Sequence, residues 1–213
     1  MICHTKKCIF VHIPKTAGSS IEDAIWGDDL SIRTVEHLWM GAVRPGYNKY
    51  QSGGLQHLLA PQIRQEVGND IFSSYYKFSF VRNPWAKVVS QFYYLKTRPD
   101  LLQMMGLHRW SPFRSYLKAL EKSHEMHVQS MEQHQFIYTQ EEGCIVDFVG
   151  RFENLHNDFR IVSNRLGMGD VSLPHARKSK RTKPYQTFYT ARQRQLIETI
   201  YQRDIQLFDY SFD

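Results

Sequence analysis

The chain has 213 residues, a net charge of +6 at pH 7 and a pI of about 9.2, and 42% of its residues are hydrophobic. This composition supports a folded core and excludes an intrinsically disordered chain. The excess of Lys and Arg favours anionic partners, such as phosphates, nucleic acid or acidic glycans, without choosing among them.

The stretch MICHTKKCIFVHI, residues 1–13, lacks the long apolar core of a signal peptide, and no apolar run is long enough to span a membrane. We therefore expect a cytoplasmic protein without a membrane span. Cys3, Cys8 and Cys144 are sparse and odd in number, which argues against a disulfide framework. Cys3, His4 and Cys8 lack a fourth ligand at zinc spacing, so we predict no bound metal.

Strand and helix patterns alternate along the chain without an internal repeat. This alternation favours a single three-layer α/β domain, residues 1–213, around a central parallel sheet. In chain order the predicted elements are a strand at Cys8–Ile13, a helix at Ser19–Trp26, a short helix at Pro61–Val67, a strand at Tyr75–Val81, a helix at Pro84–Leu95, a helix opened by Pro112 and capped by Ser111, a strand at Cys144–Phe152, a helix at Asn154–Leu166 that stops at Gly167, a basic loop at His175–Tyr185 and a last helix capped by Thr190.

The segment FVHIPKTAGSSIE, residues 10–22, places a tight turn between a predicted strand and a predicted helix. The first N–H groups of a helix lack carbonyl partners and the helix dipole adds positive charge, so the turn can hold an anion. Gly18 lets the backbone approach a ligand, and Lys15 adds a point charge. Hydroxyl donors are available from Thr16, Ser19 and Ser20.

This turn has one alternative interpretation and differs from one well-known phosphate-binding motif. It could be an ordinary connection whose serines only cap the helix. It is not a Walker A loop, because Lys15 precedes the single glycine and the first glycine of that motif is missing. This difference counts against an ordinary ATP or GTP phosphotransferase.

The segment FSFVRNPWAKVVSQFYYLK, residues 78–96, repeats the order of strand, turn and helix. Arg82 comes at the predicted strand end, and Asn83 and Pro84 turn the chain into the helix. A guanidinium group offers a planar fork of N–H donors that suits a second phosphate. Alone, the same arginine could equally form a salt bridge at the end of a sheet.

Together the two segments resemble the sulfotransferase family that uses 3′-phosphoadenosine 5′-phosphosulfate (PAPS). HIPKTAGSS is similar to that family's 5′-phosphosulfate loop, and FVRNPWAKVVSQFYY is similar to its 3′-phosphate element. In that element an arginine and a serine eight residues later hold the 3′-phosphate, and Arg82 and Ser90 have this spacing. The segment VGRFENLHNDF, residues 149–159, and the stretch after Leu173 resemble the carbohydrate-type branch of the family.

The resemblance implies a P-loop-NTPase-like sulfotransferase fold and transfer of a sulfuryl group from PAPS to an acceptor hydroxyl. It further implies that Phe152 lies against adenine, although a core position at a strand end would explain this residue equally well. The basic loop would close over the nucleotide, although a solvated charge run is the plainer interpretation. The donor-binding residues implied by the resemblance are Lys15, Thr16, Ala17, Gly18, Ser19, Ser20, Arg82, Ser90, Phe152, Ser179 and Arg181.

In-line transfer needs a base for the acceptor proton, positive charge on the transferring oxygens and support for the leaving phosphate. Lys15 and the helix N-terminus can supply the last two without a metal. The carbohydrate-type branch places its base, a histidine, between the two nucleotide motifs, and both His57 and His37 fit this order. We predict that His57 is the base, with His37 or a carboxylate as the alternative.

The acceptor is expected to be a saccharide, and 3′-phosphoadenosine 5′-phosphate (PAP) the nucleotide product. Residues 101–143 resemble no part of the family and are expected to contact the acceptor; His124, His127 and His134 could line its groove. Two other classes of function are compatible with the sequence: a P-loop-like small-molecule kinase, and a non-catalytic module that binds nucleotides or nucleic acid. The sequence has no groove-reading motif for nucleic acid. It does not determine the oligomeric state.

Overall fold

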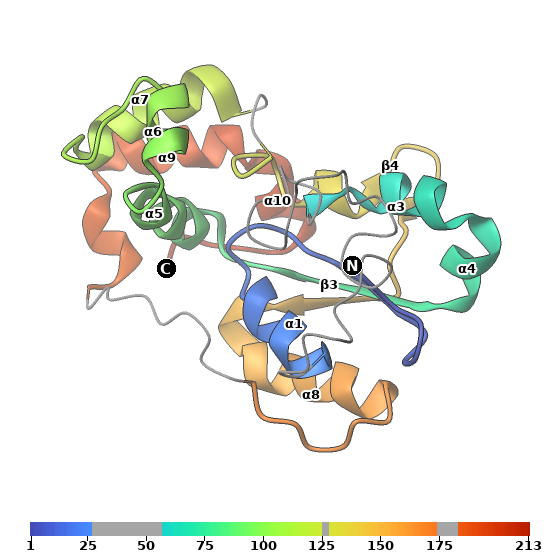
Figure 1. The fold of residues 1–213 in the computed structure, drawn as a ribbon. Helices are drawn as coiled ribbons and strands as arrows, with labels where there is room; N and C mark the ends of the chain where they lie inside the picture. Colours follow the sequence, from blue (N-terminus) through green and yellow to red (C-terminus); the bar gives the residue numbers. More distant parts are fainter. Residues whose placement is uncertain (27–56, 125–127, 174–182) are drawn as a thin grey trace. The chain divides into compact units, whose positions relative to one another are not determined.

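The computed structural model describes residues 1–26, 57–124, 128–173 and 183–213. The chain forms two compact units. Unit 1 comprises Met1–Val81 and Gln135–Lys178, and unit 2 comprises Arg82–His134 and Ser179–Asp213. Unit 1 contains the parallel strands, whereas unit 2 is built from helices (Figure 1).

The larger sheet of unit 1 has four strands in the order β1-β2-β3-β6. β1 (Ile2–Cys3) is antiparallel to β2 (Cys8–Val11), whereas β2, β3 (Tyr76–Val81) and β6 (Phe148–Arg151) are parallel. Parallel strands that are covered by other elements appear in a sequence as continuous apolar runs, and every residue of β2 is buried. The fold is therefore mixed α/β with a mostly parallel sheet, which confirms that part of the predicted fold class.

Two helices of unit 1, α1 (Gly18–Trp26) and α8 (Leu155–Arg165), pack on the sheet (Figure 1). α8 ends as predicted at Gly167, whose φ of 66° is a conformation that glycine adopts without strain. The N–H of Gly167 donates to the Asn164 carbonyl, and the N–H of Met168 donates to that of Ser163, which completes a Schellman motif. The core between sheet and helices includes Phe10, Ile21, Ile25, Phe78, Phe80, Phe159 and Val162.

Shorter elements complete unit 1. Arg64 of α3 (Ala60–Val67) forms an ion pair with Glu142, in the turn between β4 and β5. The remaining elements among the described residues of this unit are α4 (Asn69–Ser74), β4 (Tyr138–Thr139), β5 (Gly143–Cys144) and the 3₁₀ turn η4 (Phe152–Asn154). A further 3₁₀ turn, η3 (His134–Phe136), lies where the chain passes from unit 2 to unit 1.

Unit 2 has a helical core of its own. α5 (Pro84–Leu95) buries Trp85, Val88 and Phe92, and these residues recur at helical spacing, as predicted. Thr190 caps α9 (Ala191–Ile200) in a capping box with Gln193, which confirms the predicted cap. Where the structure describes unit 2, its other helical elements are α6 (Pro99–Met104), α7 (Phe113–Ser123), η5 (Tyr185–Phe188) and α10 (Gln202–Leu207).

Several predicted element ends are wrong; the strand predicted at Cys8–Ile13, for example, ends at Val11. The strand predicted at Cys144–Phe152 is interrupted at Asp147, whose backbone N–H donates to the Lys77 carbonyl while its carboxylate accepts the Lys77 N–H. Only Phe148–Arg151 pairs with β3. Ser111 is not the cap of α7, because its hydroxyl accepts the N–H of His108 and so closes the preceding turn. Within the described part of the chain, no helix combines the length and apolar character needed to cross a bilayer.

Candidate functional site

Three predicted site residues follow the carboxyl ends of parallel strands. Lys15 lies in the loop after β2, Arg82 follows Val81 at the end of β3, and Phe152 follows Arg151 at the end of β6. Val81 and Arg151 are partners in the strand register. In α/β sheets this edge is the usual ligand-binding edge, because the loops and helix N-termini that receive anions lie there.

The loop between β2 and α1 has an unusual backbone. Lys15 and Ala17 have φ values of 68° and 71°, whereas Thr16 and Gly18 have ordinary φ values. A left-handed conformation costs a residue with a Cβ about 1–2 kcal/mol, and such conformations gather at ligand sites. Alternation of left-handed and ordinary residues turns successive N–H groups into one concavity, which suits an anion. The loop backbone therefore has the geometry of an anion cradle.

The side chains of the loop divide into two groups. Thr16 is fully buried, and its hydroxyl donates to the Ile13 carbonyl over 2.8 Å, so this proton stabilises the turn. Lys15, Ser19 and Ser20 are half-buried. Of the three predicted hydroxyl donors, Ser19 and Ser20 therefore stay candidates for donating to a ligand. Thr16 can offer its backbone N–H instead.

Gly18 begins α1 and packs against a histidine. The N–H groups of Ser20 and Ile21 both donate to the Ala17 carbonyl, which starts the helix at this point. A Cβ at Gly18 would overlap the imidazole of His12. The predicted reason for a glycine, close approach of a ligand, is therefore accompanied by a second reason inside the protein.

His12 is held between the loop and the first helix. Its Nδ1 lies 2.5 Å from Oε1 of Glu22, and its ring stacks on Phe10. The histidine is buried, with 6% of its surface exposed. A carboxylate beside Nδ1 fixes the ring orientation and accepts a proton that Nδ1 donates.

His57, the predicted base, is buried beside His12. Its Nδ1 lies 2.9 Å from the main-chain oxygen of His12, and the two rings meet edge to face with centroids 4.6 Å apart. A carbonyl oxygen only accepts, so Nδ1 of His57 carries the proton and Nε2 carries the lone pair. Burial lowers the pKa of His57 well below 6.5, and the electrostatic influence of His12 and Lys15 lowers the pKa further. His57 is therefore a neutral imidazole at pH 7.

In unit 2, the turn that follows β3 is well defined. Asn83 caps α5 by accepting the N–H of Ala86, and its Nδ2 donates to the Ser211 carbonyl over 2.7 Å. Pro84 occupies the first helical position, where no N–H is needed. Arg82 precedes this cap, and Ser90 lies on α5 at a rise of roughly 9 Å from Pro84.

A glutamine holds the backbone of Arg82. The N–H of Arg82 donates to Oε1 of Gln133, and Nε2 of Gln133 donates to the Arg82 carbonyl, each over 2.8 Å. Gln133 is fully buried, and Arg82 is 9% exposed. The side chain of Gln133 therefore replaces the hydrogen bonds that a neighbouring strand would otherwise provide.

Phe152 begins η4 and is half-buried. The turn is fixed by Asp158, whose carboxylate accepts the N–H of Arg151 over 2.6 Å and the side-chain amide of Asn154 over 2.7 Å. Phe152 thus lies in a 3₁₀ turn after the strand, whereas the prediction placed it in the strand itself. Its predicted contact with adenine stays a prediction. His37, Ser179 and Arg181 lie outside the described residues.

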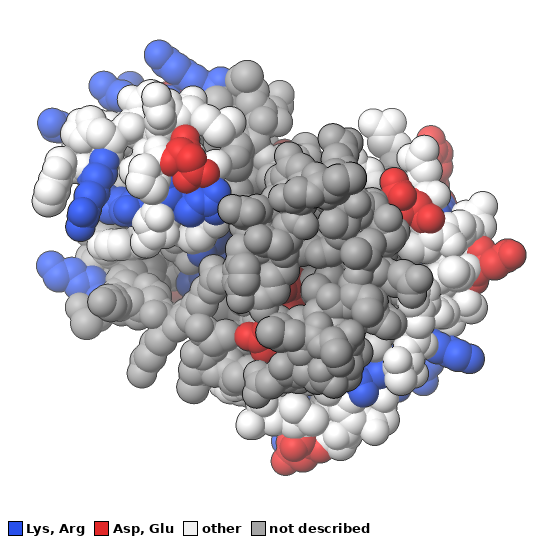
Figure 2. All heavy atoms as spheres, viewed as in Figure 1, with Lys and Arg blue, Asp and Glu red and all other residues white. Residues whose placement is uncertain are grey.

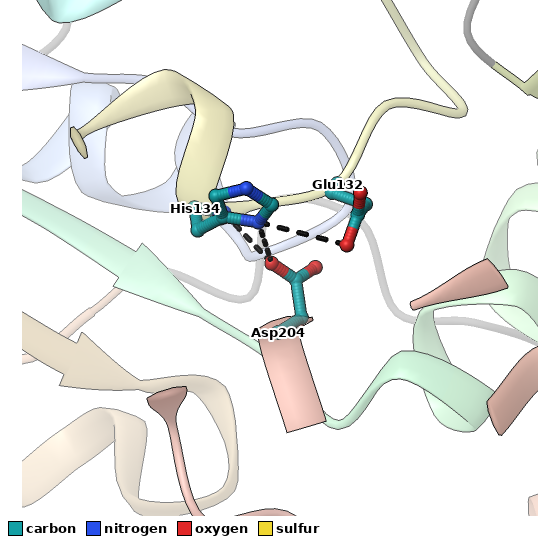
Figure 3. A group of neighbouring side chains, drawn as sticks. All are labelled: Glu132, His134 and Asp204. Carbon is teal, nitrogen blue, oxygen red and sulfur yellow. Dashed lines mark hydrogen bonds and ion pairs between the residues drawn. The ribbon is translucent and has the colours of Figure 1, made fainter. Parts of the chain in front are cut away.

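One group of side chains in the described part of the chain has the composition of a metal site. Glu132, His134 and Asp204 bring their ligand atoms within 4.8 Å of one another (Figure 3). Asp204, however, already accepts the N–H groups of Gln133 and His134 and the Nδ1–H of His134. These bonds make the group a closed internal network, and His134, only 7% exposed, does not line an acceptor groove.

Three residues of the site were not predicted: His12, Glu22 and Gln133. His12 belongs to the segment FVHIPKTAGSSIE, residues 10–22. Its role, however, depends on packing against Gly18 and on Glu22, ten positions later. Gln133 lies 51 positions from Arg82. No spacing rule connects residues at these separations, so only the three-dimensional structure reveals them.

Comparison with known proteins gives two matches. Residues 1–211, nearly the whole chain, match the sequence model described as "Sulfotransferase family". An uncharacterized protein from Archaeoglobus fulgidus is 32% identical over 106 residues, which are 50% of this chain and 79% of that protein. No solved structure matches.

Proposed function

We propose that this chain, which belongs to the sulfotransferase family, transfers the sulfuryl group of PAPS to a hydroxyl group of a carbohydrate or glycoconjugate. Family membership supports sulfotransferase activity in general. The donor, the acceptor class and the base are proposed from the residues described above. One observation carries the proposal: a backbone anion cradle at Lys15 and Ala17 lies in the same unit as His57, whose pKa is lowered well below 6.5 by burial.

In the proposed reaction, Nε2 of His57 takes the proton of the acceptor hydroxyl. The acceptor oxygen forms a bond to sulfur, and the bond between sulfur and the bridging oxygen of the phosphosulfate breaks. The electron pair of that bond passes to the 5′-phosphate of PAP. Lys15 and the N–H groups at the start of α1 stabilise the negative charge that grows on this phosphate. The charge is met by protein groups, so we propose that no metal takes part.

We assign the 3′-phosphate of the nucleotide to Arg82 and Ser90. The assignment is supported by their spacing in the sequence and by the rigid backbone of Arg82, which Gln133 and the Asn83 cap hold on either side. A guanidinium group can bind phosphate through two parallel N–H donors. Phe152, Ser179 and Arg181 are proposed to contact adenine and the phosphates.

The proposal of a saccharide acceptor is supported by the surface of unit 2. Trp110 is 80% exposed, and Figure 2 shows Lys and Arg side chains spread over this part of the molecule with few acidic side chains between them. An exposed indole ring can stack on a sugar, and cationic side chains can pair with sugar carboxylates or sulfates. A nearby depression of about 310 Å³ is lined by Lys96, Thr97, Pro99, Leu102, Leu107, His108 and Arg109.

A kinase of the P-loop type is less well supported. In the Walker A motif a Ser or Thr directly after the lysine holds Mg²⁺. The corresponding residue here is Thr16, which is buried and donates its hydroxyl proton to Ile13. A purely non-catalytic nucleotide-binding module would not need the neutral histidine beside the loop.

A transfer assay tests the proposal directly. Purified protein would be incubated with PAPS carrying radioactive sulfur, an excess of EDTA, and a panel of neutral, carboxylated and sulfated oligosaccharides. We expect label to pass to a saccharide in the presence of EDTA, and His57→Asn to slow the transfer by about 10²–10⁴-fold. Phosphate transfer from ATP with Mg²⁺, with no sulfuryl transfer to any acceptor, would overturn the proposal in favour of a kinase.

A further inference from the structure

We propose that residues 130–134 act as a positioning element for Arg82, with Gln133 and Asp204 as its principal positioning residues. All of these residues belong to unit 2. The inference rests on the proposed function, in which Arg82 binds the 3′-phosphate. It assigns a task to part of the segment 101–143, which the sequence alone could only connect with the acceptor.

Gln133 contacts the backbone of Arg82 directly. Arg82 lies between the end of β3 and the N-cap of α5, so neither a strand ladder nor a helix satisfies its backbone. The amide of Gln133 satisfies both groups, with N–H···O and N–H···O=C distances of 2.8 Å. Two bonds to one residue fix its backbone dihedral angles and hence the origin and direction of its side chain.

Gln133 is in turn held by Asp204. Asp204 projects from α10 toward residues 132–134, as Figure 3 shows. Its Oδ2 accepts the Gln133 N–H over 2.6 Å, and its Oδ1 accepts the N–H and Nδ1–H of His134 over 2.8 and 2.9 Å. Asp204 is fully buried, and three donors satisfy its carboxylate.

Two further bonds connect the beginning of the element to α5 and to the residue between α9 and α10. The hydroxyl of Tyr201 donates to the Ser130 carbonyl over 2.7 Å, and Nζ of Lys87 donates to the Met131 carbonyl over 3.1 Å. Lys87 is 1% exposed, and its burial lowers its pKa to about 8. The ammonium group also lies 5.4 Å from the centroid of the Tyr201 ring, so this buried lysine contacts both the segment and the residue that binds Ser130.

The network therefore leads from α10 through Asp204 and Gln133 to Arg82. Such a chain of buried, hydrogen-bonded polar groups holds its members in one arrangement. An arginine held in this way pays less conformational entropy when it binds phosphate than one on a free loop. We infer that the network increases affinity specifically for a nucleotide that carries a 3′-phosphate.

The test compares two nucleotides. Affinities for PAP and for AMP, which lacks the 3′-phosphate, are measured by titration calorimetry for the wild type, Arg82→Ala, Gln133→Met and Gln195→Met. Gln133→Met keeps the length of the side chain but removes both hydrogen bonds, and Gln195 is an exposed glutamine on α9 that serves as the matched control. We expect Gln133→Met to weaken PAP binding roughly tenfold, the effect of losing about one hydrogen bond to a charged group. AMP binding should change less than twofold, and Gln195→Met should change neither.

Several outcomes would overturn the inference. Equal losses for PAP and AMP would show a general structural role, and unchanged PAP binding would show no role. If Gln133→Met does not fold, Gln133→Glu decides: it keeps an acceptor for the Arg82 N–H, but it loses the donor to the Arg82 carbonyl and adds a carboxylate that repels this oxygen. Its PAP affinity should fall between wild type and Arg82→Ala. A thermal stabilisation by Zn²⁺ that His134→Gln abolishes would instead make the network a metal site.

The same data separate this inference from the proposed function. If the wild type does not prefer PAP to AMP, or if Arg82→Ala leaves that preference intact, the proposed role of Arg82 itself is wrong. If the wild type prefers PAP, Arg82→Ala removes the preference and Gln133→Met retains it, only the positioning role is wrong.

Discussion

Nδ1 of His57 lies 2.9 Å from the main-chain oxygen of His12, so the loop that forms the anion cradle also determines which nitrogen of His57 carries the proton. The bond leaves the lone pair on Nε2. Because burial keeps the ring neutral, the histidine can accept a proton at pH 7. The anion cradle and the predicted base are therefore joined by one hydrogen bond within unit 1.

Replacement of His57 by Asn should separate binding from turnover. We expect kcat to fall by about 10²–10⁴-fold, the usual contribution of general-base catalysis, while the Kd for PAP changes little. His156→Asn, at an exposed position on α8, is the matched control and should behave as the wild type. Turnover of His57→Asn at the wild-type rate would show that another group is the base.

The stability of the protein should depend on the protonation of His57. The pKa of this residue is lower in the folded protein than in the unfolded chain, so below pH 6.5 the unfolded chain binds more protons. The free energy of unfolding should therefore fall as the pH drops below about 6.5, by at most about 1.4 kcal/mol per pH unit from this residue. Urea unfolding at pH 7.5 and pH 5.5 measures the effect. The pH dependence should be weaker in His57→Asn, and an unchanged dependence would contradict the assigned burial of a neutral imidazole.

Gly18→Ala should destabilise the protein, because the added methyl group would overlap the imidazole of His12. We expect a loss of about 1–3 kcal/mol in the free energy of unfolding, measured by denaturant titration. In a His12→Ala background the same change should cost much less, since the overlapping ring is gone. A cost that is equal in both backgrounds would mean that His12 is not the reason for the glycine.

Lys15→Ala should weaken binding of PAP by roughly 10–100-fold, as expected for the loss of a charge-assisted contact to phosphate. Lys7→Ala provides an unusually close control. Lys7 is also a lysine with a positive φ, 47°, but it is exposed in the turn between β1 and β2. Equal effects of the two substitutions on the Kd, measured by calorimetry, would show that Lys15 acts only through the net charge of the protein.

The elements with strong local signals could be predicted. The apolar spacing of α5, its asparagine and proline start, and the Thr190 cap of α9 are properties of short sequence segments, and the structure confirms them. The strand after Cys144 was predicted too long because the apolar residues on either side of Asp147 hide the break in pairing. A run of apolar residues does not show where a strand begins to pair.

The site itself could be predicted only in part. Lys15 and Ala17 take left-handed conformations that neither residue type favours, so the shape of the cradle does not follow from local preference. The bonds from Glu22 to His12 and from Gln133 to Arg82 join residues that no motif relates. Those contacts depend on tertiary packing, which overrides local preference at functional sites.

The central claim is that the protein binds the product nucleotide PAP, which carries a 3′-phosphate as well as a 5′-phosphate. Titration calorimetry with PAP, ADP and ATP, in the absence of metal, tests this claim most directly. We expect tight binding of PAP and weak or undetectable binding of ADP and ATP. Binding of ATP that equals or exceeds that of PAP, and that strengthens with Mg²⁺, would contradict the claim.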